Sequence, residues 1–265
     1  MDTIIILSNL GLGDNIFNIP LANYLSKNNK VEFVCKKHNA KNMEYFFRDN
    51  NNISLLIVNS DSDISLKYGC PIEKYKRIIC GKHMYASGTH IDNSDISSFP
   101  FFMYNDIGIN TNILKQHSEY KNTGKSIELY NIIKNNQYIF VCNNSSDGEI
   151  FNINNFLNEN KINLEEIIVI CSNKNYYSKE DKFYNIAEKF VYETNGLLIL
   201  DYKLIIENAM IIAITDSSLF CFTVQLQLNS NNNFLYTRPG NKFINWRKIV
   251  SFFNKKFAIN ATRNN

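Results

Sequence analysis

Short apolar runs alternate with helical segments at the start of the chain. The runs span residues 3–8, 31–35 and 53–58, and the helical segments span 15–27 and 40–48. Continuous apolar runs of this length are typical of strands buried on both faces of a parallel sheet. The order strand, helix, strand, helix, strand predicts a doubly wound α/β domain. Pro20 is expected near the first turn of its helix, where its missing N–H costs least.

The same alternation returns in the second half of the chain. Strand-like runs occur at 138–142, 167–171, 197–200, 210–215 and 233–236, and helical segments at 182–192, 203–208, 219–228 and 243–257. Residues 59–136 are less regular, with a further strand expected at 77–80 and loops with short helices at 87–112. We therefore expect two Rossmann-like domains, residues 1–135 and 136–265, facing a central cleft, with a C-terminal helix. Ligands of such folds bind at the carboxyl ends of the strands.

A glycine-containing turn follows the first predicted strand. Gly11 and Gly13 flank Leu12, and Asp14 comes next. A turn that opens a helix here brings backbone N–H groups to the carboxyl edge of the sheet. Asp14 would then stand at the mouth of the cleft, where its carboxylate could take a proton from an attacking hydroxyl. The alternative is an aspartate that only caps the helix.

A dinucleotide-binding site fits this turn poorly. The Gly-x-Gly-x-x-Gly fingerprint requires glycine at position 16, which is Ile16. The second strand runs into Lys36 and Lys37, so no carboxylate follows it to hold the ribose hydroxyls.

Polar residues also follow the predicted strands of the second half. Asp216, Ser217 and Ser218 come directly after the run 210–215, at the start of a helix. Unpaired N–H groups and hydroxyls at such a point suit a diphosphate, although plain helix capping explains them too.

Two further positions are candidates for binding the same anion. Ser145 and Ser146 follow the first strand of this half and could bind phosphate oxygens, or form an ordinary polar turn. Arg238 follows the run 233–236 and could clamp a phosphate, or form a surface salt bridge.

Composition excludes several classes of protein. The net charge is only +3, with 28 basic and 25 acidic residues, and no basic cluster typical of a nucleic-acid-binding face is present. The six cysteines form no Cys-x-x-Cys pair, and the spacing of Cys70, Cys80, His83 and His90 fits no compact zinc site. We find no signal peptide and no apolar stretch long enough to span a membrane. A reducing cytoplasm fits best.

The opening motif resembles a known family. Gly11-Leu12-Gly13-Asp14, with Pro20 after five further residues, is similar to the start of the heptosyltransferase-like glycosyltransferases (family 9) and related GT-B enzymes. The segment 207–218, ending in Asp-Ser-Ser, resembles the family's Asp-Ser-Gly or Asp-Thr-Gly near the C-terminus. The resemblance implies a GT-B fold, an inverting mechanism without metal, and a nucleotide-sugar held by the C-terminal domain. It also implies that Asp14 is the general base and that Ser217 and Ser218 contact the diphosphate.

The chain departs from the family pattern at three places. Ser218 replaces the family's glycine, residues 219–222 lack the expected histidine, and residues 143–147 replace a His-Pro-Gly turn. Heptose is therefore not implied as the sugar. We expect a glycosyltransferase that moves a sugar from a nucleotide-sugar to a hydroxyl of a glycan or glycolipid, with no cofactor. The alternatives are a GT-B-like protein that binds sugar nucleotides or glycans without catalysis, and a Rossmann NAD(P)-dependent enzyme that modifies sugar nucleotides.

Overall fold

The computed structural model describes residues 3–7, 11–60, 76–79, 99–105, 107–177, 182–192, 196–239 and 244–261. The chain divides into two compact units, which are treated separately below. The first comprises residues 1–120 and 243–245, and the second comprises 121–242 and 246–265. The boundary predicted at 135/136 therefore falls inside the second unit. The reason is local: the Thr123 hydroxyl donates to the buried Asp201 carboxylate at 2.7 Å, which fastens the following helix to the second unit.

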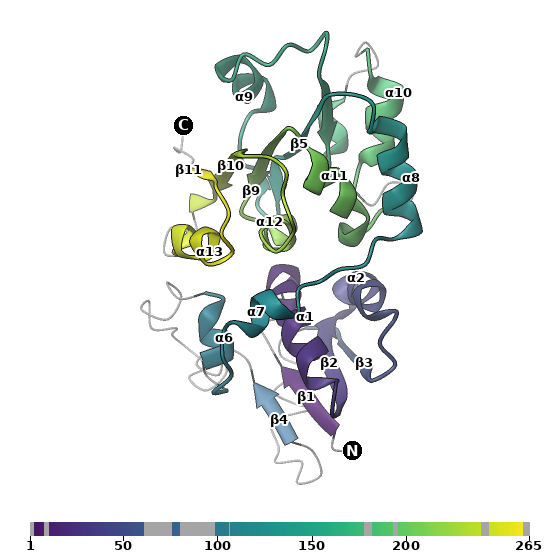
Figure 1. Cartoon of the computed structure of the whole chain (residues 1–265), viewed down its shortest axis with the longest axis vertical. Coiled ribbons are helices and arrows are strands. Elements are labelled where there is room, and N and C mark those ends of the chain that lie inside the picture. The colour runs from purple at the N-terminus through teal and green to yellow at the C-terminus, as the bar shows by residue number, and fades with distance from the viewer. Residues whose placement is uncertain are drawn as a thin grey trace. The chain divides into compact units, whose positions relative to one another are not determined.

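The first unit contains a four-stranded parallel sheet. Its strands are β1 (Thr3–Leu7), β2 (Lys30–Lys36), β3 (Ile53–Val58) and β4 (Lys76–Ile79). They lie in the order β3-β2-β1-β4, as Figure 1 shows, and every neighbouring pair is parallel. The connecting helices are α1 (Leu12–Leu25) and α2 (Lys37–Phe47), followed by the short α6 (Phe101–Asn105) and α7 (Ile113–Gln116). The predicted strand–helix alternation is confirmed here.

Helix α1 begins earlier than predicted, and this changes the place of Pro20. The helix starts at Leu12, so Pro20 lies in its interior rather than near its first turn. Its ring takes the place of the N–H that would otherwise donate to the carbonyl of Ile16. The helix tolerates this because most of its middle is buried, Ile16 and Leu21 completely. Tertiary packing, which dominates the stability of helices in proteins, offsets the missing bond.

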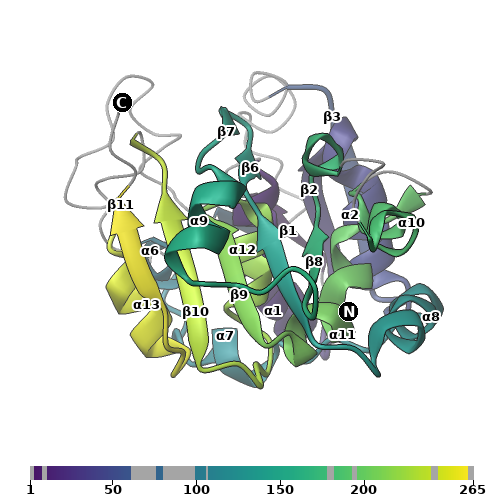
Figure 2. The same ribbon diagram turned by 90° about the horizontal axis from the view of Figure 1, so that it is seen from above.

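The second unit contains a five-stranded parallel sheet. Its strands are β5 (Tyr138–Cys142), β8 (Ile168–Cys171), β9 (Ile211–Thr215), β10 (Asn232–Thr237) and β11 (Ala258–Ala261). They lie in the order β11-β10-β9-β5-β8, which Figure 2 shows across the sheet. All four neighbouring pairs are parallel. Numbered by their place in the chain, the strands follow the order 2-1-3-4-5, one of the two common doubly wound arrangements.

Short helices connect these strands. They are α8 (Gly124–Ile133), α9 (Ile153–Glu159), α10 (Tyr184–Ala187), α11 (Lys203–Asn208), α12 (Ser218–Thr223) and α13 (Trp246–Phe252), with 3₁₀ turns η1 (Lys174–Tyr176), η2 (Glu188–Phe190) and η4 (Ile199–Tyr202). A small antiparallel hairpin, β6 (Asn144–Ser145) and β7 (Gly148–Glu149), precedes α9.

The strands β5, β8 and β9 of the second sheet are buried on both faces. Helix α9 covers one face (Figure 2), where Phe156 and Leu157 pack with alternate residues of the strands, such as Val141 and Ala213. Phe140 precedes Val141 on β5, so its side chain points to the opposite face of the sheet. There it contacts the buried Tyr202 of η4, with ring centroids 5.6 Å apart. This double burial explains why the strands read as continuous apolar runs.

Two predictions for the second half are wrong in detail. The apolar run 197–200 is not a strand but leads into η4, because the Asp201 carboxylate accepts a hydrogen bond from the N–H of Leu198 at 3.0 Å and closes a turn. The predicted C-terminal helix 243–257 is shorter, and the chain continues into the unpredicted strand β11, which pairs with β10. The sheet thus has the expected number of strands, with β11 in the place of the run 197–200.

The cysteines behave as core residues wherever the structure describes them. Cys35, Cys142, Cys171 and Cys221 are all buried. Burial, helped by the Glu44 carboxylate, raises the pKa of the Cys35 thiol to about 11. Such a thiol stays protonated and unreactive near neutral pH. Cys70 and Cys80 lie outside the described residues.

Candidate functional site

The carboxyl edge of the second sheet brings together most of the residues that the sequence singled out. All its strands are parallel, so β5, β9 and β10 end at the same edge. Beyond β5 the chain turns towards β8, and beyond β9 it turns towards β10, so neighbouring connections diverge between β5 and β9. Such a switch point is where open α/β sheets bind their ligands.

Arg238 lies at this edge and is held by Asp216. The Nε and backbone N–H of Arg238 both donate to Oδ1 of Asp216, at 3.0 and 3.1 Å. The Asp216 side chain is completely buried and that of Arg238 is 18% exposed. The pair is therefore not the surface salt bridge considered from the sequence. The two hydrogen bonds fix the position of the guanidinium. Asp216 is therefore a positioning residue, and Arg238 is the group that would contact a ligand.

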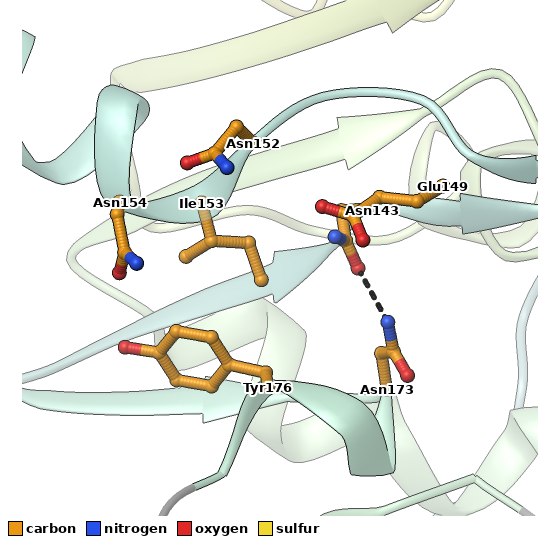
Figure 3. A pocket seen from close by; sticks show the side chains of 7 residues that line it. All are labelled: Asn143, Glu149, Asn152, Ile153, Asn154, Asn173 and Tyr176. Atoms are coloured by element: carbon orange, nitrogen blue, oxygen red, sulfur yellow. Dashed lines mark hydrogen bonds between the residues drawn. The ribbon is translucent and has the colours of Figure 1, made fainter.

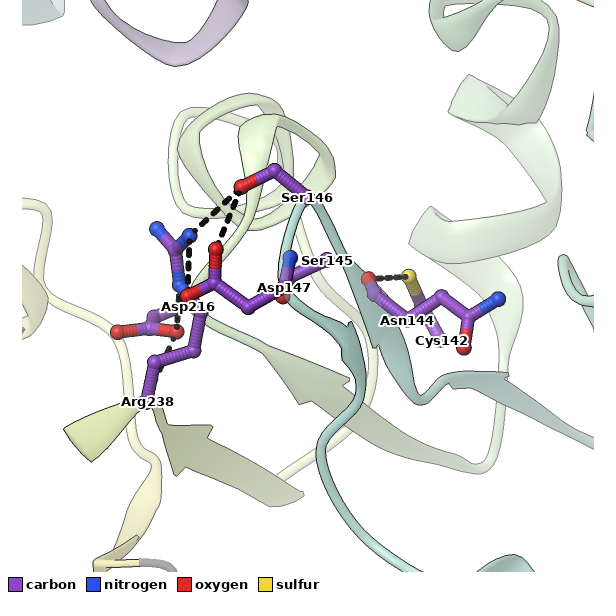
Figure 4. A network of polar contacts seen from close by, with 7 residues as sticks. All are labelled: Cys142, Asn144, Ser145, Ser146, Asp147, Asp216 and Arg238. Carbon is purple, nitrogen blue, oxygen red and sulfur yellow. Dashed lines mark hydrogen bonds and ion pairs between the residues drawn. The ribbon is translucent and has the colours of Figure 1, made fainter. Parts of the chain in front are cut away.

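The other end of the guanidinium reaches the β6–β7 hairpin, as Figure 4 shows. Nη1 of Arg238 donates to the Ser146 hydroxyl at 3.0 Å and lies 3.4 Å from the Asp147 carboxylate. Ser146 in turn donates to Asp147 at 3.1 Å, and the Ser145 hydroxyl accepts the N–H of Asp147 at 3.0 Å. Gly148 completes the tight turn at φ 95°, a conformation that favours glycine. The tip of the hairpin is thus held in place by its contacts with the Arg238 guanidinium.

Ser217 and Ser218 lie at the start of α12, next to Asp216. Ser217 is the N-cap residue, and its side chain makes no capping hydrogen bond. Its hydroxyl faces the Cys142 thiol at the end of β5: burial raises the pKa of that thiol, and the Ser172 and Ser217 hydroxyls lower it. Ser218 is half-buried in the first position of the helix. Of the two hydroxyls, that of Ser218 is better placed for an external ligand.

A small pocket adjoins the hairpin on the side of β8 (Figure 3). Its volume is about 140 Å³, and four asparagines, Glu149, Ile153 and Tyr176 line it. The buried Asn173 donates from Nδ2 to Oδ1 of Asn143 at 3.2 Å, and Asn143 donates to the carbonyl of Phe151 at 3.3 Å. Amides beside an aromatic ring suit a neutral, hydroxyl-rich group. Sequence reasoning missed this pocket, although Asn143 directly follows a predicted strand.

Asp14 lies in the first unit, in the first turn of α1. The N-cap residue of the helix is Gly11, in an extended conformation, and Gly13 is already helical. The Asp14 carboxylate folds back over Gly11: a Cβ added there would lie 2.5 Å from Oδ2 of Asp14. The absence of a side chain at Gly11 therefore lets the carboxylate lie against the start of the helix, where the helix dipole favours negative charge.

Two kinds of feature are absent from the described part of the chain. Its histidines, cysteines and acidic residues form no group of three that could hold a metal ion. In the same residues, no helix has the length and apolar composition that a membrane crossing requires.

Comparison with solved structures identifies the fold. The glycosyl transferase family 9 protein from Veillonella parvula DSM 2008 is similar over 98% of this chain and 86% of its own, with 12% identity and a TM-score of 0.52. Lower similarity is found to E. coli heptosyltransferase WaaC with ADP, at 11% identity over 92% of this chain and 93% of that one, with a TM-score of 0.41. No protein-family model and no curated protein matches the sequence. The chain therefore has an α/β fold of parallel sheets like that of a family 9 glycosyltransferase, which confirms at the level of the fold the resemblance expected from the sequence.

Proposed function

We propose that this protein is a glycosyltransferase that moves a sugar from a nucleotide-sugar to a hydroxyl of a glycan or glycolipid. The observation that carries the proposal is the position of Arg238, which the buried Asp216 carboxylate fixes at the switch point of the second sheet. A planar guanidinium matches phosphate oxygens with two parallel hydrogen bonds. The hydroxyls of Ser146 and Ser218 lie at the same edge. Together they suit the diphosphate of a nucleotide-sugar.

The proposed reaction is inverting and does not use a metal. The Asp14 carboxylate takes the proton of the acceptor hydroxyl while the oxygen of that hydroxyl attacks the anomeric carbon of the donor. The bond from that carbon to the diphosphate oxygen breaks, and Arg238 stabilises the charge that develops on the leaving group. The proposal requires that Asp14 and the carboxyl edge of the second sheet face each other across a cleft during transfer. It includes a cytoplasmic location, supported by the buried thiols of Cys35, Cys142 and Cys171.

A thermal-shift screen followed by a transfer assay tests the proposal. UDP-, GDP-, ADP-, CMP- and dTDP-linked sugars are added in turn, and a ligand that binds only the folded state raises the melting temperature. Donors that bind are then incubated with hydroxyl acceptors, with and without EDTA. We expect one nucleotide class to stabilise the protein, and turnover that EDTA does not change. If no nucleotide-sugar stabilises the protein, the proposal fails.

A sugar-nucleotide-binding protein without catalysis is the second candidate. The resemblance predicts a histidine within residues 219–222, where the chain has Leu, Phe, Cys and Phe. All four residues are buried, so none of them presents a polar group to a ligand. Stabilisation by a nucleotide-sugar with neither transfer nor donor hydrolysis would favour this candidate.

Gly11→Ala should lower the transfer rate and cost at most about 1–2 kcal/mol of stability, because alanine is a poorer N-cap residue than glycine. The added Cβ would lie 2.5 Å from Oδ2 of Asp14, so the carboxylate has to turn away. Misplacing a catalytic group by about 1 Å lowers kcat by roughly ten- to a hundredfold. The measurement is kcat at saturating donor. Gly124→Ala is the matched control, because nothing lies within 4 Å of the Cβ added there. Equal rates for the two variants would contradict the role of Gly11.

Asp147→Asn should strengthen binding of the nucleoside diphosphate. The half-exposed Asp147 carboxylate lies 3.4 Å from Nη1 of Arg238, where a phosphate oxygen would compete with it. Removing one exposed charge of this kind changes affinity by about two- to fivefold. Isothermal titration calorimetry measures the change, with Glu166→Gln, at an exposed position outside the candidate site, as the control. Weaker binding by Asp147→Asn would show that Asp147 supports the site instead of competing for it.

A further inference from the structure

A second concave surface lies at the other end of the second sheet, where β10 and β11 begin. This groove has a volume of about 720 Å³. Its walls come from residues 231–233, from α13 and the turn after it, and from residues 255–259. It lies at the amino ends of the strands, whereas the site proposed above lies at their carboxyl ends. The inference below does not depend on the proposed glycosyltransferase activity.

The groove is positively charged. Arg247, Lys255 and Lys256 line it, and none of its described lining residues is acidic. Partial burial lowers the pKa of Lys255, while the nearby Glu207 carboxylate raises it. Glu207 itself forms an ion pair with Lys203 at 2.8 Å. Arg247 and Lys256 are exposed, so they can meet an incoming anionic group.

The groove also has an apolar part and a fixed shape. Val250 is buried, and Phe257 and Ile259 are half-buried along its length. Asn233 ties its walls together, since Nδ2 donates to the carbonyls of Ser230 at 3.1 Å and Lys256 at 3.0 Å. Asn254 lies in the turn after α13 with φ 55°, where the chain changes direction before β11. A groove held in this way loses little conformational entropy when a ligand binds.

Strand β11 borders the groove and is the edge strand of its sheet. It pairs with β10 on one side, and no strand of the described residues pairs with its other side. Ala258 and Asn260 are exposed along it. The unpaired backbone groups of an edge strand can form hydrogen bonds with another extended chain. Cationic side chains beside the edge favour a chain that carries acidic side chains.

We propose that β11 and the adjoining groove bind an extended acidic segment of a partner polypeptide by strand addition. Backbone hydrogen bonds to β11 provide affinity, and side chains of the partner alternate between two surroundings. On the side of α13, carboxylates meet Arg247 and aliphatic side chains reach Phe257 and Ile259. Lys256, directly before the strand, meets a further carboxylate. The edge of β11, which no described strand covers, and the groove beside it favour a chain over a flat anionic membrane surface.

Fluorescence anisotropy with a designed peptide tests this proposal. The probe is a labelled peptide of about twelve residues, enough for one long strand, in which glutamate alternates with valine or threonine. We expect saturable binding that weakens about fivefold or more in Arg247→Gln/Lys256→Gln, in line with the loss of two exposed charge pairs. Both positions are exposed, so the variant should fold normally. Lys134→Gln/Lys189→Gln removes the same charge at exposed positions outside the groove and should bind like wild type.

A second probe separates strand addition from charge attraction. The same peptide carrying N-methyl groups at alternate positions keeps its charge but cannot form the backbone hydrogen bonds, and it should bind roughly tenfold more weakly or worse. Equal binding of the methylated and unmethylated peptides would overturn the proposal. So would the absence of peptide binding, or binding to vesicles of phosphatidylglycerol in preference to the peptide.

Discussion

Asp14→Asn is expected to lower the transfer rate by about 10²- to 10⁴-fold, the usual contribution of a general base. An amide has nearly the shape of the carboxylate but cannot accept the proton of the acceptor hydroxyl. Nucleotide binding should stay nearly unchanged, because the diphosphate contacts proposed here come from the second unit. The decisive comparison is kcat from a transfer assay against the Kd of the nucleoside diphosphate from calorimetry.

Stability provides the control for this variant. Asp14 lies in the first turn of α1, where a negative charge contributes about 0.3–1 kcal/mol through the helix dipole. This loss is too small to unfold a normal domain, so a large fall in rate reports chemistry. Asp49→Asn, at a half-exposed aspartate of the same unit, should keep full activity. A folded Asp14→Asn protein with wild-type turnover would remove the catalytic role of Asp14.

Arg238→Gln is expected to weaken binding of the nucleoside diphosphate and to destabilise the second unit. The affinity should fall roughly ten- to a hundredfold, because a hydrogen bond to a charged group contributes about 1.5–3 kcal/mol. The free energy of unfolding should fall by about 3–5 kcal/mol, since the change removes the Arg238 guanidinium from the completely buried Asp216 carboxylate. Calorimetry measures the first effect and urea denaturation the second.

Two further variants separate these effects. Arg238→Lys keeps the charge but loses the planar fork, so it should restore part of the stability and little of the affinity. Arg48→Gln removes a surface ion pair of 4.0 Å with the half-exposed Asp49 and should cost at most about 1 kcal/mol. If Arg238→Gln destabilised the protein no more than Arg48→Gln, the anchoring role of Asp216 would be wrong.

The sequence predicted the central strands well because they are buried on both faces. The run 138–142 forms β5 with the predicted bounds, and every residue of it is buried. The run 53–58 also forms β3 with the predicted bounds, although β3 is only partly buried. A strand that must be apolar on both sides leaves a signal in the order of residues alone. The helix 203–208 was also predicted at its observed bounds, between the apolar run 197–200 and β9.

The errors arose where a side-chain hydrogen bond or a partner strand decides local structure. The run 197–200 is as apolar as a strand, yet the Asp201 side chain turns it into a 3₁₀ helix. Strand β11 has the mixed sequence Ala-Ile-Asn-Ala and becomes a strand only because β10 lies beside it. Propensity does not reveal pairing of this kind, which depends on a partner strand more than twenty residues earlier in the chain.

Three residues of the candidate site were named from the sequence, but not the connections between them. Ser146, Asp216 and Arg238 were each singled out because they follow predicted strands, and the structure joins them directly. That Asp216 is buried and holds Arg238, and that Asp147 shares the same cation, depends on side-chain directions that a sequence pattern does not contain. The asparagine-lined pocket could not be predicted either, because it depends on the pairing of β5 with β8, which places Asn173 beside Asn143.

The position of β11 has a consequence for protein synthesis. Of the five strands of its sheet, β11 is made last, after every residue of the Arg238 network. Until residues 258–261 leave the ribosome, β10 is the outer strand and its backbone is open to other chains. A nascent chain paused in this interval would carry its proposed nucleotide-binding residues complete and the backbone edge of β10 uncovered, which makes chaperone contact most useful at that stage.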